Sequence, residues 1–357
     1  MEKETNHCTH HHGECHCFII PVKILKKFSK DKKLSAKARK GFADAARFET
    51  EWRKAREVKS LVTASAQKML PSGLTKVPSK APVVSVFDCK QHTTLPGTPI
   101  SNPGSSTDPT SKRTFKETTS LAQFYKTVFG RNSIDNAGMA LISSIHYSVK
   151  YNNAFWNGDQ MTYGDGDGNI FVDFTKSDDV VGHEITHGVT QHTLGLAYHD
   201  EPGGLNESIS DVFGSMFRQW EAGQDVAHAD WLIGKEIMGP GAISRGYTCL
   251  RDLSNPAASH CLSPQPTNFS QYRNGMDPHS SSGIPNFAFY KAAMAIGGKS
   301  WIILGKIWYK SVTGFGPSPN MTMKQFANRT RSVAGSLFRT RPAIKKAVDK
   351  AWLDVGL

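Results

Sequence analysis

The apolar residues of the first part of the chain predict a small helical unit. After a polar stretch at 1–16, which we expect to be a flexible tail, the chain continues with the apolar run CFIIPVKILKKF. Residues 17–60 then carry apolar side chains spaced among charges, which is typical of amphipathic helices. These apolar positions are Leu34, Phe42, Ala46 and Trp52. Residues 61–85 are rich in Pro, Ser and Lys, so we predict a linker that is open to proteolysis.

The remainder of the chain changes from strand patterns to helix patterns. Residues 86–181 contain aromatic and β-branched runs broken by Asn-Gly and Asp-Gly, which are typical of strands and turns. One helix is predicted within them, from residue 119 to a stop at Gly130. The pattern is mostly helical in 182–357. This order predicts an α+β protein with an N-terminal β-rich lobe and a C-terminal, mainly α-helical lobe.

Composition and charge narrow the classes of protein that fit. Hydrophobic residues make up 38% of the chain, with 19 Phe and 7 Trp, so a wholly disordered chain is excluded. No run of 18 apolar residues occurs, and we expect no membrane span. Residues 1–60 hold 15 Lys or Arg against 8 Asp or Glu. This surplus of 7 positive charges is more than half of the net charge of +12. Because Phe and Tyr do not interleave that basic run in the way a stacking platform requires, we expect a solvated helical segment rather than a nucleic-acid partner.

The amino terminus guides our expectation of location and redox state. The stretch MEKETNHCTHHHGECHC lacks the charged-then-apolar layout of a signal peptide. We therefore expect a cytoplasmic or non-classically secreted protein with reduced thiols. We also expect a monomer. In an oxidising compartment, Cys249 and Cys261 could close a loop.

The stretch VVGHEITHGVTQ at 180–191 contains the first candidate catalytic residues. His183 and His187 stand four residues apart, so a helix places them on one face, where two neutral imidazoles can hold Zn²⁺. Glu184 is rotated away from that face, and it could take a proton from a water on the metal without ligating it. The alternative is an ordinary helix that carries two histidines. The histidine pair alone does not decide between this alternative and a zinc site.

The next predicted helix, LNESISDVFGSMF, strengthens the metal hypothesis. Glu207 and Asp211 stand on one side of it, next to an apolar face. A carboxylate there would complete three protein ligands and leave the fourth position open for water, as a catalytic zinc site requires. Asp211 can accept the free N–H of one ligating histidine, and Asn206 can orient the other.

The stretch from Gly182 to Phe217 resembles the thermolysin family of zinc metallopeptidases. Further matches, in the family's order and spacing, run from about Phe87 to the C-terminus: RNSID, NNAFWNG, YGDGDG, DWLIG, SSGIPN and AWLDVG. The resemblance implies two lobes with the active-site helix between them and a zinc-dependent endopeptidase acting on proteins or peptides. It implies His183, His187 and Glu207 as zinc ligands, Glu184 as general base, and Tyr198 and His279 as oxyanion-stabilising groups.

The sequence departs from the family pattern beside His279. The family has an aspartate five residues before this histidine, where this chain has Asn274. Asp277 is close in sequence, and which of the two orients His279 stays open.

The resemblance also implies a peptide-binding edge. Asn153 and Ala154 would hydrogen-bond the backbone of a peptide added as a strand, and Arg251 would grip the carbonyl on the leaving side. The implied specificity pocket is apolar throughout: Phe171, Phe174, Val180, Ile233, Ile237 and Leu250. We therefore predict cleavage on the amino side of bulky apolar residues such as Leu, Phe or Ile.

A double calcium site of the family is predicted to be absent. The matching positions are Asp179, Arg218, Asp230, Leu232 and Lys235. Because Ca²⁺ needs six to eight oxygen ligands, this set cannot supply them. We hypothesise that Arg218 and Lys235 replace the metal charge and pair with Asp179 and Asp230; a simple loss of the site is the alternative. The run DGDGN at 165–169 lacks the glutamate that closes a calcium loop, and we predict a tight turn.

The amino-terminal unit resembles the short propeptide of the protealysin-like branch of the family, although Val22 stands where a second proline is usual. The match implies a zymogen whose residues 17–60 inhibit the enzyme intramolecularly and are removed by a cut in 61–85. The tail could bind metal, including the catalytic zinc through Cys15 or Cys17, or have no role. The alternative function is a catalytically silent, zinc-stabilised binding protein.

Overall fold

The computed structural model describes residues 17–66 and 81–357. The predicted tail and most of the predicted linker lie outside these residues, and the predicted domain boundaries stay predictions. The strands are β1 Cys17–Phe18, β2 Val84–Asp88, β3 Thr98–Pro99, β4 Leu141–Ile145, β5 Ala154–Trp156, β6 Met161–Tyr163, β7 Leu232–Ile233 and β8 Arg251–Asp252. The helices are α1 Val22–Ser29, α2 Ala36–Ala66, α3 Pro109–Phe129, α4 Asp178–Gln191, α5 Asp200–Glu221, α6 Pro240–Ile243, α7 Pro278–Ser281, α8 Gly283–Ile296, α9 Leu304–Thr313, α10 Met323–Leu337 and α11 Pro342–Asp354.

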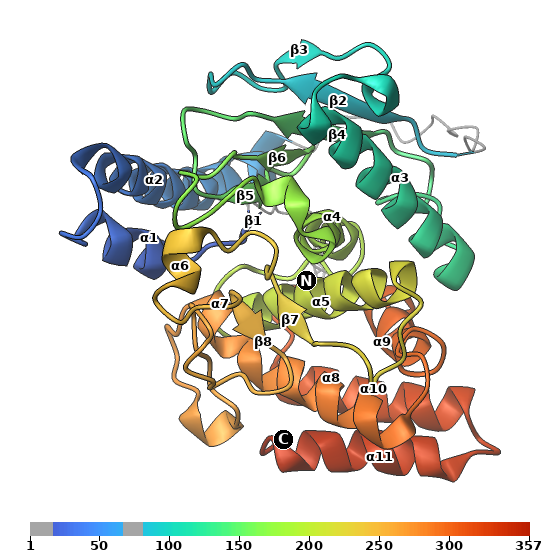
Figure 1. The fold of residues 1–357 in the computed structure, drawn as a ribbon. Helices are drawn as coiled ribbons and strands as arrows, with labels where there is room; N and C mark the ends of the chain where they lie inside the picture. Colours follow the sequence, from blue (N-terminus) through green and yellow to red (C-terminus); the bar gives the residue numbers. More distant parts are fainter. Residues whose placement is uncertain (1–16, 67–80) are drawn as a thin grey trace, which may run out of the picture.

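The predicted α+β organisation is confirmed. Within the described residues, one mixed sheet has the strand order β1-β5-β6-β4-β2-β3 and lies in the N-terminal half (Figure 1). The strand pairs β2–β4 and β4–β6 are parallel, and the other pairs are antiparallel. The C-terminal half is mainly helical, and α4 and α5 lie between the two halves in Figure 1.

Helix α3 begins ten residues earlier than the apolar pattern predicts. Asp108 caps it by accepting hydrogen bonds from the amides of Thr110 and Ser111, and Pro109 occupies the first turn, where its missing N–H costs nothing. The helix ends where predicted, because Gly130 adopts the left-handed conformation, with a φ of 70°, that terminates helices.

The two helices that carry the predicted metal ligands pack unusually closely. A Cβ added to Gly182 on α4 would lie 2.9 Å from the Cα of Gly214 on α5. Real side chains do not approach backbone so closely, so glycine at both positions allows the helix axes to approach. This contact brings the ligand-bearing faces of α4 and α5 together.

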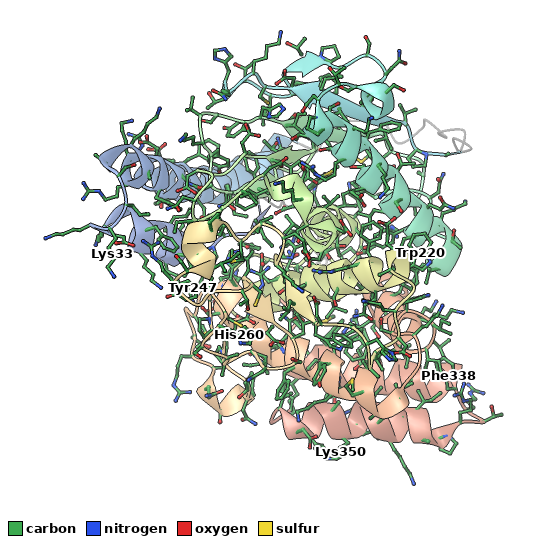
Figure 2. The ribbon with its side chains drawn as sticks, viewed as in Figure 1. Lys33, Trp220, Tyr247, His260, Phe338 and Lys350 are labelled. Atoms are coloured by element: carbon green, nitrogen blue, oxygen red, sulfur yellow. The ribbon has the colours of Figure 1, made fainter. Side chains whose placement is uncertain are left out.

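The amino-terminal unit is helical and packs on the rest of the molecule. Phe42 and Ala46 on α2 are buried, as the amphipathic pattern predicts. Helix α2 extends to Ala66, so the first six residues of the predicted linker are helical. Charged side chains such as Lys33 and Lys350 point outward at the periphery (Figure 2). None of the helices in the described part of the chain is both long and apolar enough to span a membrane.

Candidate functional site

The two histidines of α4 face one another in the interior. The Nε2 atoms of His183 and His187 are 2.9 Å apart, and both side chains are fully buried. Burial, together with the nearby charge of His183, lowers the pKa of His187 to about 3. The His187 ring is therefore neutral at ordinary pH, which is the form that ligates a metal.

Glu207 on α5 completes a ligand set of three residues. Its carboxylate oxygens lie 3.5 Å from the Nε2 of His183 and 3.5 Å from the Nε2 of His187. Tetrahedral zinc with bonds of 2.0–2.1 Å separates its ligands by about 3.3 Å. The Oε2 atom of Glu207 is buried and makes no hydrogen bond within residues 17–66 and 81–357. The two histidine Nε2 atoms, 2.9 Å apart, lie closer than that ligand separation, whereas the distances to Glu207, the donor types and the buried oxygen fit a zinc ion.

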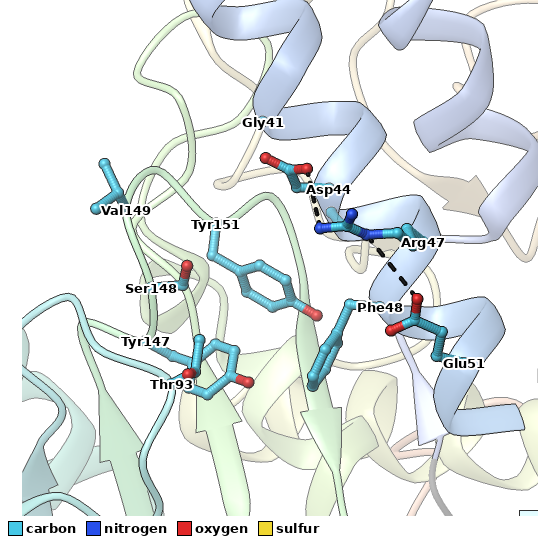
Figure 3. Close-up of a pocket in the computed structure, with 11 residues that line it drawn as sticks. Gly41, Asp44, Arg47, Phe48, Glu51, Thr93, Tyr147, Ser148, Val149 and Tyr151 are labelled. Atoms are coloured by element: carbon cyan, nitrogen blue, oxygen red, sulfur yellow. Dashed lines mark hydrogen bonds and ion pairs between the residues drawn. The ribbon is translucent and has the colours of Figure 1, made fainter. Parts of the chain in front are cut away.

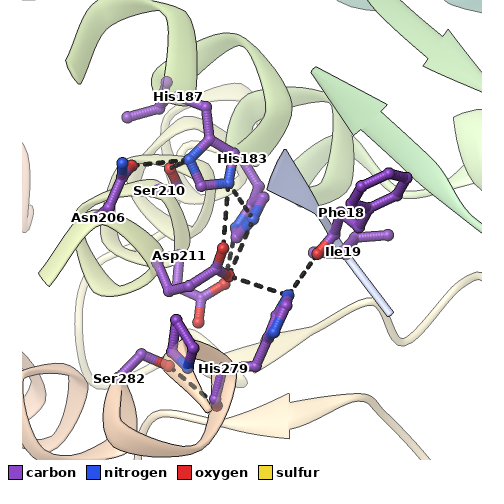
Figure 4. A network of polar contacts seen from close by, with 12 residues as sticks. Phe18, Ile19, His183, His187, Asn206, Ser210, Asp211, His279 and Ser282 are labelled. Carbon is purple, nitrogen blue, oxygen red and sulfur yellow. Dashed lines mark hydrogen bonds and ion pairs between the residues drawn. The ribbon is translucent and has the colours of Figure 1, made fainter. Parts of the chain in front are cut away.

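The predicted orienting residues contact the Nδ1 atoms of the histidines (Figure 4). The Nδ1 of His183 is 2.9 Å from Oδ1 of Asp211, and the Nδ1 of His187 is 2.8 Å from Oδ1 of Asn206. Each contact places the ring proton on Nδ1 and directs the Nε2 lone pair toward the ligand set. Burial alone would raise the pKa of Asp211, but the charge of Arg251 and the hydrogen bond with His183 hold it well below its usual range.

Three contributors to this network were not predicted in these roles. Ser210 lies 3.0 Å from the Nδ1 of His187, and Asn286 donates to Asp211 at 2.9 Å. Arg251 donates to both carboxylate oxygens of Asp211, at 2.8 and 2.7 Å. Asn286 ends the SSGIPN motif and could have been found from that match, whereas Ser210 left no signal.

Glu184 is fully buried beside the ligand set. Burial and then the negative charge of Glu207 raise its pKa well above the usual value, and the Trp156 amide and Arg251 offset this only in part. A buried carboxylate of this kind is suited to accept and release a proton.

His279 and Tyr198 lie together on the other side of the ligand set. The hydroxyl of Tyr198 donates to Glu207 and lies 3.4 Å from the Nε2 of His279. The Nδ1 of His279 is 2.9 Å from Oδ1 of Asp277. The open question of the histidine's orienting acid is thereby answered in favour of Asp277, while Asn274 is exposed.

The predicted peptide-binding residues contact the chain's own amino-terminal segment. The carbonyl of Ala154 accepts the Ile19 amide at 3.1 Å, and the side chain of Asn153 accepts the Ile20 amide at 2.9 Å. Arg251 donates to the carbonyl of Ile19 at 3.2 Å. The Ala154 carbonyl and the side chains of Asn153 and Arg251 thus all bind the backbone of residues 19–20.

The six residues of the predicted specificity pocket are buried and belong to one apolar core. At the edge of that group, the Phe171 ring lies 6.5 Å from the Phe28 ring and 6.2 Å from the Phe42 ring. The amino-terminal helices therefore cover this side of the pocket.

A separate pocket of about 310 Å³ lies between α2 and the loop before β5 (Figure 3). Asp44, Arg47 and Glu51 line it from α2, opposite Tyr147 and Tyr151. None of the predicted site residues lines it, so it is distinct from the ligand set.

The hypothesised ion pairs form at the calcium-matched positions. Arg218 contacts the buried Asp179 at 3.0 Å and Asp230 at 3.4 Å, and Lys235 contacts Asp230 at 3.1 Å. Glu236, which was not predicted, also binds Arg218. At the DGDGN run, the Asp167 carboxylate accepts three following amides, which forms the predicted tight turn.

The cysteines are only partly as expected. Cys17 is disulfide-bonded, which contradicts the expectation of reduced thiols, and Cys15 lies outside the described residues. The Cys17 sulfur lies within 4.8 Å of ligand atoms of His187 and Glu207. Cys249 and Cys261 are free thiols whose sulfurs are 3.8 Å apart.

Known families and structures resemble the chain over nearly its whole described length. The model of the thermolysin metallopeptidase catalytic domain matches residues 80–191, and that of the thermolysin metallopeptidase alpha-helical domain matches residues 194–357. The precursor of protealysin, a metalloproteinase from Serratia proteamaculans, superimposes with a TM-score of 0.80 and 32% identity. The match covers 95% of this chain and 99% of that one.

Two relatives match this chain over most of their length. The "Extracellular metalloprotease" of Pectobacterium carotovorum subsp. carotovorum is 39% identical over 298 residues, which are 80% of this chain and 84% of the relative. The "Neutral protease NprE" of Bacillus pumilus is 40% identical over 243 residues, which are 66% of this chain and 72% of the relative.

The expectation of a cytoplasmic or non-classically secreted protein is wrong. The Pectobacterium relative is named as extracellular, which points to secretion. The expectation relied only on the absence of a signal-peptide pattern at the amino terminus. The absence of such a pattern is weak evidence of where a protein acts.

Proposed function

Because this chain belongs to the thermolysin family of zinc metallopeptidases, we propose that it is a secreted zinc endopeptidase made as a zymogen, which cuts proteins on the amino side of bulky apolar residues. The observation that carries this proposal is the meeting of His183, His187 and Glu207 beside the buried carboxylate of Glu184. A bound zinc ion would supply a Lewis acid that activates water and polarises the carbonyl to be attacked.

The proton transfers are assigned to Glu184. This carboxylate accepts a proton as water adds to the carbonyl carbon, and it then delivers that proton to the leaving nitrogen. Its burial supports the assignment, because burial raises the pKa of this carboxyl group. Near neutral pH, its charged and neutral forms therefore differ less in free energy than those of an exposed carboxyl group do.

The developing oxyanion is assigned to His279 and Tyr198. Their N–H and O–H groups lie on the same side of the ligand set, 3.4 Å apart, and both are hydrogen-bond donors. Asp277 positions the histidine ring by accepting its Nδ1 proton. Arg251, Asn153 and Ala154 would hold the peptide backbone as an added strand.

The proposed specificity rests on the apolar pocket. Phe171, Phe174, Val180, Ile233, Ile237 and Leu250 offer no charge or hydrogen-bonding group, so a charged side chain entering among them would lose its hydration without compensation. Leu, Phe or Ile would instead gain burial of apolar surface.

The zymogen proposal is supported by the position of the amino-terminal segment, which contacts the residues assigned to substrate binding. Removal by a cut in 61–85 would open the site. Nothing found favours the alternative of a catalytically silent binding protein.

The test is digestion of an unfolded protein by the purified chain, with and without the zinc chelator 1,10-phenanthroline, and mapping of the cut sites by mass spectrometry. We expect chelator-sensitive cuts before Leu, Phe and Ile, with activity rising as residues 17–60 are lost. A preference for acidic or basic residues after the cut rejects the proposed specificity. Full activity before any loss of residues 17–60 rejects the zymogen.

A further inference from the structure

The strand at the amino terminus of the described chain lies in the site with a defined direction. Strand β1 pairs antiparallel to β5, with Phe18 opposite Phe155, and the Ile19 amide continues the ladder to the Ala154 carbonyl at 3.1 Å. This is the mode in which an extended peptide adds a strand to the edge of a sheet. The segment is therefore bound along its backbone and not only through side chains.

Two side chains of the enzyme fix the register of this segment. Asn153 accepts the Ile20 amide at 2.9 Å and donates to the Ile20 carbonyl at 3.1 Å. Arg251 donates to the Ile19 carbonyl at 3.2 Å. Because Arg251 is assigned to the carbonyl on the leaving side of the cut, Ile19 lies on that leaving side.

The preceding carbonyl faces the group assigned to the oxyanion. The Nε2 of His279 lies within hydrogen-bond distance of the Phe18 carbonyl oxygen (Figure 4). The Nδ1 of the same ring lies 2.9 Å from the Asp277 carboxylate. The same Nε2 atom is 3.6 Å from Glu207, which places the Phe18 carbonyl next to the ligand set.

We infer that the Phe18–Ile19 peptide bond occupies the position of the bond to be cut, so that the chain's own amino-terminal segment is its first substrate. This inference rests on the proposed function. Water would add to the Phe18 carbonyl carbon, and its proton would pass through Glu184 to the Ile19 nitrogen as the carbon–nitrogen bond breaks. The products are a carboxylate at Phe18 and an amine at Ile19, and water is the only co-reactant.

The side chains at the bond agree with the proposed specificity. Ile19 is bulky and apolar, is fully buried, and belongs to the same continuous core as Leu250 and Ile233 of the predicted pocket. Phe18 packs on the Phe155 ring, with ring centroids 5.2 Å apart. Both sides of the bond are therefore held by apolar contacts as well as by the backbone ladder.

Cleavage at this bond would not by itself release the inhibitor. Residues after Ile19 remain attached through α1 and α2, where Phe28 and Phe42 contact Phe171 and Lys23 donates to Ser280 at 2.6 Å. We therefore place this cut before the cut in 61–85. The order of events is one cut within the molecule, followed by removal of the helical unit.

The experiment follows the amino terminus of the purified full-length chain over time, by intact mass and N-terminal sequencing. We expect a new terminus at Ile19, formed at a rate independent of protein concentration, and no such terminus in Glu184→Gln. Ile19→Gly should slow the cut about tenfold or more, because it removes the apolar side chain from the pocket. Ile20→Gly is the matched control and should slow it less.

A second readout does not depend on hydrolysis. In Glu184→Gln, the amides of Ile19 and Ile20 should be protected from hydrogen exchange, because they donate to Ala154 and Asn153. Free exchange at both amides overturns the inference.

The outcomes separate this inference from the proposed function. If the enzyme digests an added protein but Phe18–Ile19 stays intact until other bonds of the chain are cut, the inference fails and the proposed function stands. If neither the added protein nor any bond of the chain is cut with zinc present, both fail.

Discussion

At the scale of single residues, Asp277 organises the environment of His279 by two contacts. As the cap of α7, its carboxylate accepts the His279 amide at 3.0 Å, and the same oxygen lies 2.9 Å from the Nδ1 of the ring. One carboxylate thus fixes both the backbone and the imidazole of this residue. Where the family usually has an aspartate, this chain has Asn274. Asp277 therefore takes the role of orienting the ring.

Asp277→Asn tests that role. The amide keeps the size of the side chain but removes the charge of the acceptor at Nδ1, and hydrogen bonds to charged groups contribute about 1.5–3 kcal/mol. We expect kcat/KM for a peptide substrate to fall about 10- to 100-fold. Asn274→Ala is the matched control and should retain activity; equal losses in both variants would contradict the assignment.

The proposed histidine ligands could be predicted from the sequence because their relation is local. His183 and His187 are one helical turn apart, so the helix alone places them on one face. Ser210 and Gly214 could not be singled out in the same way. Their contacts with His187 and Gly182 exist only after α4 and α5 pack together, and no spacing in the sequence encodes that packing.

At the scale of elements, His146 joins two segments that are distant in sequence. It follows β4, and its Nδ1 is 2.7 Å from Asp165 while its Nε2 is 3.1 Å from Asp108, the cap of α3. The hydrogen bond with Asp165, opposed by burial and assisted by Asp108, raises the pKa of His146 to about 9. The protonated ring thus ties the start of α3 to the sheet.

This contact makes the free energy of unfolding depend on pH. The folded pKa exceeds the unfolded value of about 6.5, so the stabilisation is complete below about pH 6.5 and is lost as pH rises through about 9. We expect the loss to be on the order of 1–3 kcal/mol. His146→Asn should remove this slope in urea unfolding measured from pH 6 to pH 10, whereas the exposed control His228→Asn should keep it; an unchanged slope in His146→Asn would reject the account.

The predicted start of α3 shows why element boundaries escape the apolar pattern. The helix was placed from residue 119 because its apolar residues cluster there, while the segment before it reads as a turn-rich loop. Its true start is set by Asp108 and Pro109, which act through backbone hydrogen bonds rather than through burial. Periodicity reports the buried face of a helix and leaves a polar first turn unmarked.

At the scale of the whole molecule, the two halves are joined beside the site by ion pairs. Arg218 on α5 reaches Asp179 on α4 and Asp230 and Glu236 near β7. Asp179 is fully buried, and burial raises its pKa although Arg218 opposes the rise. We propose that these pairs hold the junction that calcium holds in other members of the family.

Arg218→Met tests the proposal by leaving a buried carboxylate without its cation. Breaking a buried pair in this way costs about 3–5 kcal/mol, and we expect a loss of that size in chemical unfolding. Lys235→Met is the control, because an exposed pair contributes at most about 1 kcal/mol.

Calcium itself gives the complementary test of the same junction. The wild-type melting temperature should be the same in calcium-depleted buffer and after addition of calcium chloride, with zinc held constant. A clear rise on adding calcium would show that oxygen ligands for the ion are present after all.

The central claim is that His183, His187 and Glu207 hold one zinc ion on which Glu184 acts as general base. The most direct measurement is zinc content together with peptide hydrolysis for the wild type, Glu184→Gln and the ligand variant His183→Ala. We expect one zinc per chain in the first two, loss of zinc in the third, and hydrolysis by Glu184→Gln reduced about 10²- to 10⁴-fold. Hydrolysis by Glu184→Gln at the wild-type rate, or by a wild-type chain that holds no zinc, would contradict the claim.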